Sequence, residues 1–93
     1  MDVKSFLAED CPAAFKESMC IMDCIYVMRQ ELVEGDYEQA IVATENALRS
    51  FKQLHKMQQE KAHSDEVQAV IQEAKEKGKG IIVIQSIQRL LNG

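Results

Sequence analysis

Cys20 and Cys24 are the residues whose spacing best suits chemistry, because four residues apart on a helix they share one face. Such a pair could be half of a zinc site or a redox pair, but zinc needs two further ligands. The only imidazoles, His55 and His63, lie far along the chain and eight residues apart. Cysteine also packs as a small apolar side chain. We therefore predict structural cysteines, no metal, no cofactor and no enzymatic activity.

Two other patterns have simple explanations. The segment KEKGKG, residues 75–80, carries lysines and glycines, but it lacks the spacing and the Lys-Ser/Thr ending of a phosphate-binding loop. Asp23 is the one charge within the apolar run MCIMDCIYVM, residues 19–28. Two interpretations of Asp23 stay open: it lies at the rim of the folded unit, or it is a polar anchor inside a partner-binding groove.

Composition indicates one small helical domain spanning residues 1–93, with 46% hydrophobic residues and a single proline. A net charge of −4 without a basic patch argues against nucleic-acid binding. Apolar runs are too short for a membrane span, which needs about 20 residues. The odd count of three cysteines suggests a reducing compartment, so we expect a cytoplasmic protein without a membrane span.

The apolar run belongs to an expected helix from Asp10 to Val33, whose apolar stripe is wider than an ordinary amphipathic face. Gly35 and Asp36 then predict a helix end followed by a helix cap. A second helix is expected from Tyr37 to Lys61, antiparallel to the first because the link is so short. We expect its buried face to comprise Ala40, Ile41, Thr44, Ala47, Leu48, Phe51 and Leu54.

Ser64 is a candidate cap for a third helix, with Val67, Val70, Ile71 and Ala74 as its buried stripe. At Gly78 and Gly80 two interpretations compete. Either this helix continues, bent or weakened at the glycines, or it breaks before a short helix from Ile81 to Leu91. The fold class is thus all-α, an antiparallel bundle of three long helices, the last one either continuous or broken at Gly78–Gly80.

The segment EGDYEQAIVATENAL, residues 34–48, resembles the second half of a tetratricopeptide repeat. Gly35, Asp36, Tyr37, Ala40 and Ala47 fall on that pattern, whereas the preceding helix departs from it. The same layout is similar to that of the MIT domain, and this resemblance implies a three-helix bundle that binds short amphipathic helices in its grooves. In class, the chain also resembles small helical chaperones of bacterial secretion and flagellar export systems.

We therefore hypothesise a non-catalytic protein-interaction module, a small adaptor or chaperone that binds an amphipathic helix of a partner protein. The excess apolar surface of the first helix motivates this hypothesis. The expected binding residues are Met22, Ile25, Tyr26, Ile82 and Leu90. The alternative is a structural or regulatory homodimer that self-associates through the apolar C-terminal helix around Ile82.

Overall fold

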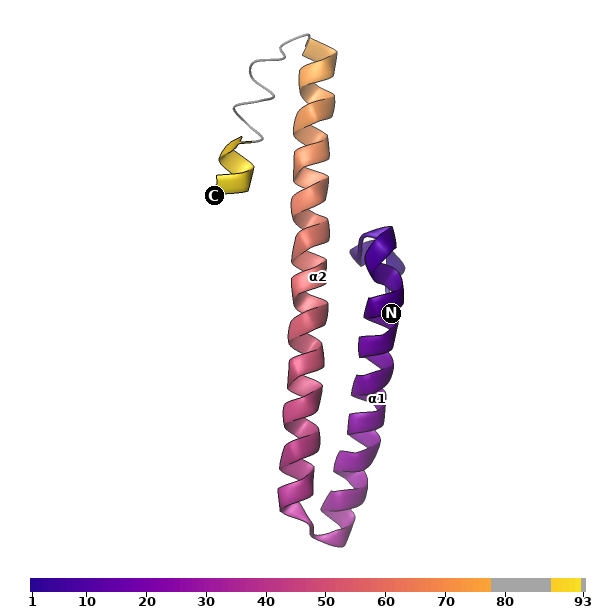
Figure 1. Cartoon of the computed structure of the whole chain (residues 1–93). Helices are drawn as coiled ribbons and strands as arrows, with labels where there is room; N and C mark the ends of the chain where they lie inside the picture. Colours follow the sequence, from indigo (N-terminus) through magenta and orange to yellow (C-terminus); the bar gives the residue numbers. More distant parts are fainter. Residues whose placement is uncertain (78–87, 93) are drawn as a thin grey trace. The chain divides into compact units, whose positions relative to one another are not determined.

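The computed structural model describes residues 1–77 and 88–92. Two short 3-10 turns, Val3–Ser5 and Ala8–Asp10, precede helix α1 (Cys11–Glu34), and helix α2 (Tyr37–Lys77) follows it (Figure 1). Residues 88–92 are helical as well, and no strand occurs in the described ranges. The all-α prediction is confirmed. The prediction of three long helices is wrong, because within the described ranges only α1 and α2 are long.

The expected break before Ser64 does not exist, and α2 runs through it as one helix of 41 residues. The polar residues 58–63 include glutamine, glutamate, lysine and alanine, which are good helix formers, and the segment contains neither glycine nor proline. Lys61 also forms an ion pair with Asp65, one turn on, across the expected boundary. A serine can cap a helix, but without a residue that ends the preceding helix it does not create a new one.

The chain divides into two compact units, Met1–Gln58 and Gln59–Gly93, and the boundary falls within α2. The first unit contains α1 and the start of α2, and the second contains the rest of α2 and residues 88–92. In the second unit, Ala74 is buried, and Val67, Val70 and Ile71 are half-buried, as expected. The expected break at Gly78–Gly80 and the apolar run from Ile81 to Ile84 lie outside the described residues.

A tight turn joins α1 to α2. Gly35 adopts the left-handed conformation with φ of 79°. Its N–H donates to the Leu32 carbonyl at 3.3 Å, and the Asp36 N–H donates to the Glu31 carbonyl at 2.9 Å. This bond pattern is a Schellman motif, which satisfies the last carbonyls of α1. Asp36 then caps α2, because its Oδ1 accepts the Gln39 N–H at 3.1 Å.

We expect Gly35→Ala to destabilise the hairpin by about 1 to 2 kcal/mol, because an L-residue pays a steric cost in the left-handed conformation. A Cβ added at Gly35 meets no atom within 4 Å, so the backbone conformation alone sets the cost. Urea unfolding followed by circular dichroism measures this change, and Gly35→Asn, which tolerates a positive φ, is the control. An unchanged stability in Gly35→Ala contradicts the left-handed turn.

Three carboxylates lie around this turn. The pKa of Glu31 is raised, mainly by desolvation and further by the charges of Glu34 and Asp36. A raised carboxyl pKa means that the folded state binds a proton more readily than the unfolded chain. The stability that protonation of Glu31 contributes is therefore present at low pH and is lost as pH rises through the folded pKa. We expect Glu31→Gln to raise the unfolding temperature at about pH 7 and to leave it nearly unchanged at about pH 3.5. Equal shifts at both pH values contradict the electrostatic cause.

Small side chains form the contact between the two helices in the first unit. In α1 the buried positions are Ala14, Ile21 and Cys24, and in this stretch of α2 they are Ala43, Ala47 and Ser50. Their spacings, mostly three and four residues, are those of an antiparallel coiled-coil seam. A side-chain contact from Thr44 Oγ1 to Met28 Sδ, at 3.0 Å, fixes the register of the seam.

The expected buried face of α2 is therefore partly wrong. Ala47 is buried, and Ala40 and Leu54 are half-buried, but Thr44 is exposed, and Ile41, Leu48 and Phe51 are 58%, 52% and 53% exposed. The small residues occupy the seam because they let the two backbones approach closely. The larger apolar side chains of α2 lie one residue beyond Ala40, Ala47 and Ser50, and this offset rotates them by about 100° away from the other helix.

Candidate partner-binding groove

One side of the hairpin carries a surface that we call the apolar face. It consists of large apolar residues one position after the seam in each helix, together with Leu32 and Ile41, which lie seven residues from Ile25 and Leu48 on the same rows. In an antiparallel pair these positions lie on the same side. Each of its seven large side chains is between 40% and 64% exposed. Its members are Phe15, Met22, Ile25 and Leu32 of α1 and Ile41, Leu48 and Phe51 of α2.

The part of the apolar face away from the α1–α2 turn is hollowed into an open groove of about 470 Å³. Met22 and Ile25 line it from α1, and Phe51 and Leu54 line it from α2. The groove belongs entirely to the unit Met1–Gln58 and is lined predominantly by apolar side chains. Ligand and peptide sites commonly have this kind of concave apolar lining.

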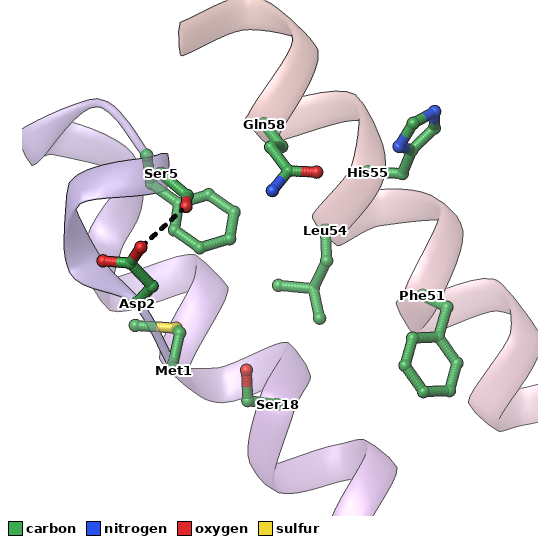
Figure 2. A pocket seen from close by; sticks show the side chains of 9 residues that line it. Met1, Asp2, Ser5, Ser18, Phe51, Leu54, His55 and Gln58 are labelled. Atoms are coloured by element: carbon green, nitrogen blue, oxygen red, sulfur yellow. Dashed lines mark hydrogen bonds between the residues drawn. The ribbon is translucent and has the colours of Figure 1, made fainter. Parts of the chain in front are cut away.

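Toward the start of α1 the groove continues into a second, more polar hollow of about 370 Å³, with Phe51 and Leu54 shared between the two. Figure 2 shows Leu54 and Gln58 reaching from α2 toward the N-terminal segment that carries Asp2 and Ser5. The Ser5 hydroxyl donates to Asp2 Oδ2 at 3.4 Å, and the Lys4 N–H donates to Asp2 Oδ1 at 3.0 Å. Asp2 thus holds the short turn that walls this end of the groove.

The other side of the seam is different in character. It has a smaller depression of about 250 Å³ lined by Asp23, Gln39 and Asn46 together with Val27 and Val42. Asp23 is exposed there, on the side opposite the apolar face. Asp23 therefore lies outside the apolar groove, in agreement with the rim interpretation, and the alternative that it anchors a partner stays a prediction.

The structure brings together two of the five expected binding residues. Met22 and Ile25 both line the groove, with 62% and 40% of their surfaces exposed. Tyr26 is 65% exposed on the next row of α1, farther from the seam. Leu90 is half-buried within residues 88–92 in the second unit, and Ile82 lies outside the described residues. No described contact tests the role of either.

Sequence reasoning missed the contribution of α2 to this groove. Phe51, Leu48 and Ile41 were expected in the core, yet they lie on the open side of the hairpin. The signal that could have placed them is the run of small residues Ala40, Ala43, Ala47 and Ser50, spaced three and four apart. That run identifies the seam, and the large residues beside it are then displaced from the contact.

All three cysteines are free thiols, and Cys24 is the buried one. Burial raises the pKa of the Cys24 thiol, the neighbouring Cys20 thiol and the Asp23 carboxylate raise it further, and Arg49 opposes them. A raised pKa leaves less of the reactive thiolate at neutral pH. This arrangement suits a structural cysteine.

We expect iodoacetamide at about pH 8 to alkylate Cys24 at least about 10-fold more slowly than Cys20, which is half-buried. The rate at Cys24 should rise with pH until the pH exceeds its raised pKa. Mass spectrometry of tryptic peptides over time gives both rates, and the same reaction in denaturant is the control, in which the two rates converge. Equal rates in the folded protein contradict this assignment.

Among the residues that the structure describes, no three His, Cys, Asp or Glu side chains gather as a set able to hold a metal ion. No helix in those ranges combines the length and the apolar character needed to cross a bilayer. Comparison of the chain with protein-family models, with curated proteins and with solved structures returned no match. The tetratricopeptide-like and MIT-like resemblances therefore stay predictions, and the geometry of the groove carries the functional argument.

Proposed function

We propose that this chain is a non-catalytic protein-interaction module, an adaptor or chaperone that binds an amphipathic helix along the apolar face. The observation that carries the proposal is the groove between α1 and α2, in which Met22 and Ile25 face Phe51 with much of their surfaces exposed. Contiguous exposed apolar surface of this kind marks interaction sites in soluble proteins.

The groove has the form that helix recognition needs. Its two walls are helices, and the exposed residues of the apolar face recur at intervals of three or seven positions, as in Phe15, Met22 and Ile25. An amphipathic helix laid between two such walls buries its own apolar stripe against both. Burial stabilises the complex at about 25 cal/mol per Å² of apolar area, less the cost of association.

Methionine supports the same interpretation. Met19 and Met22 are 48% and 62% exposed, and their unbranched thioether side chains can adapt to partners of different shape. The free thiols Cys11, Cys20 and Cys24 fit a protein that works in a reducing compartment such as the cytoplasm.

Photo-crosslinking in the cells that make the protein tests this proposal. A photoreactive benzoylphenylalanine replaces Met22 on the apolar face, and the same group replaces Val42, which is 44% exposed on the opposite side, as the matched control. We expect a discrete protein adduct from position 22 and little from position 42. Mass spectrometry should map the adduct to a helical segment with apolar residues three and four apart. Equal labelling from both positions, or none from position 22, overturns the proposal.

A further inference from the structure

We propose that the helical partner of the apolar face is the same face of a second copy of this chain, so that two α1–α2 hairpins form a four-helix bundle. This inference rests on the proposed function, because it names the occupant of the same groove. It differs from self-association through the C-terminal segment around Ile82, because the contact surface lies within Met1–Gln58.

The first argument is the weakness of the hairpin alone. Its buried side chains include only two large apolar ones, Phe6 and Ile21, and the others in the seam are alanine, serine or cysteine. A unit of roughly 60 residues is marginally stable even with a well-filled core. The hairpin therefore gains stability from any further apolar burial. A second copy is available as soon as the chain accumulates, whereas a different protein is available only where both are made.

The second argument is area. The seven side chains of the apolar face are each 40% to 64% exposed. With roughly 200 Å² for each large apolar side chain, together they expose on the order of 800 Å². A standard stable interface buries about 800 Å² on each partner. The face thus has the size that a specific dimer requires, and its apolar composition is typical of homodimer interfaces.

The third argument is charge. Glu45 and Lys52 lie on α2, on the row next to the apolar face. Glu45 comes three positions before Leu48, and Lys52 comes four positions after it. A two-fold axis that runs across the two helices near Leu48, parallel to the apolar face, places α2 of one copy antiparallel on α2 of the other copy. Glu45 of each copy then lies opposite Lys52 of the other. Two-fold interfaces are self-complementary in this way, with each contact made twice.

Light scattering on the full chain after size-exclusion chromatography is the first test. We expect twice the 10.5 kDa mass of one chain at micromolar concentration. Met22→Glu and Phe51→Glu should raise the dimer dissociation constant at least about 30-fold, since each buries a charge in the interface. The controls Val42→Glu, on the opposite side, and Ile82→Glu, in the C-terminal segment, should stay dimeric.

Circular dichroism accompanies each sample. Met22 and Phe51 are 62% and 53% exposed in the single hairpin, so a glutamate there keeps its carboxylate in water within one copy. Loss of helicity in these two variants, with Val42→Glu still folded, is therefore the expected result for a hairpin that depends on its partner copy. A wild-type monomer at all concentrations overturns the inference. So does a dimer that survives Met22→Glu and Phe51→Glu, or one that Ile82→Glu alone dissociates.

The orientation has its own test. Glu45→Lys should weaken the dimer about three- to tenfold, and adding Lys52→Glu should restore it, because exposed ion pairs each contribute modestly. Failure of the double variant to recover overturns the antiparallel two-fold arrangement.

The dimer and the proposed interaction with a partner helix can be refuted separately. A monomer whose position 22 cross-links to a different protein refutes the dimer alone, whereas a monomer without any such adduct refutes both.

Discussion

Ile21→Ala should lower the free energy of unfolding by about 3 kcal/mol, the largest effect that we expect from a single truncation. Ile21 is 5% exposed and is the one large aliphatic side chain buried in the seam between α1 and α2. Its neighbours along the seam are small, so they cannot move in to fill the cavity that the truncation leaves. Within a hairpin that buries so little, this loss is a large share of the total stability.

Urea unfolding at several fixed protein concentrations measures this effect, because a dimer makes the apparent stability depend on concentration. Val27→Ala is the control: Val27 lies on the same helix, is 40% exposed and is not part of the apolar face. We expect less than about 1 kcal/mol for the control. A similar loss in both variants would show that Ile21 does not carry the contact between the helices.

Ala47→Leu should destabilise the hairpin by about 2 kcal/mol, although leucine is nearly as good a helix former as alanine. Ala47 is 4% exposed and lies in the middle of the seam, where the two helices meet through small side chains. Three added carbon atoms at this position force the helices apart or push the leucine out of a favoured rotamer.

The control for this overpacking is Ala13→Leu, which makes the same change at an exposed position of α1. We expect the control to be within about 0.5 kcal/mol of the wild type. The same urea titration applies to both. A neutral or stabilising Ala47→Leu would mean that the seam has room for a larger side chain and that the helices are not held closely together.

The helical hairpin could be predicted from the sequence because local chemistry determines its turn. Gly35 can adopt a positive φ at no steric cost, and Asp36 accepts a hydrogen bond from the first turn of the following helix. The false boundary at Ser64 shows the limit of this reasoning. A capping residue starts a new helix only where a glycine, a proline or a similar residue ends the preceding helix. Around Ser64 no such residue occurs, and the neighbouring residues favour a continuous helix.

The groove was predictable in part. Met22 and Ile25 were identified because α1 has more apolar circumference than its neighbour can cover, and both are exposed in the groove. Phe51 and Leu48 were assigned to the core because pattern reasoning equates large apolar residues with burial. A close helix contact selects small residues instead, and the large ones are left outside it. Hydrophobicity alone cannot distinguish these cases, whereas the spacing of the alanines can.

The exposed thioethers of Met19 and Met22 also make the groove chemically vulnerable. Oxidation to the sulfoxide adds a polar oxygen to a side chain whose proposed role depends on being apolar. Common thiol reductants keep Cys20 and Cys24 reduced but do not reverse this lesion, which requires dedicated reductase enzymes. The affinity of a purified sample for its partner should therefore decline with its exposure to peroxide. Two preparations of identical sequence can then differ in affinity because their methionines were oxidised to different extents.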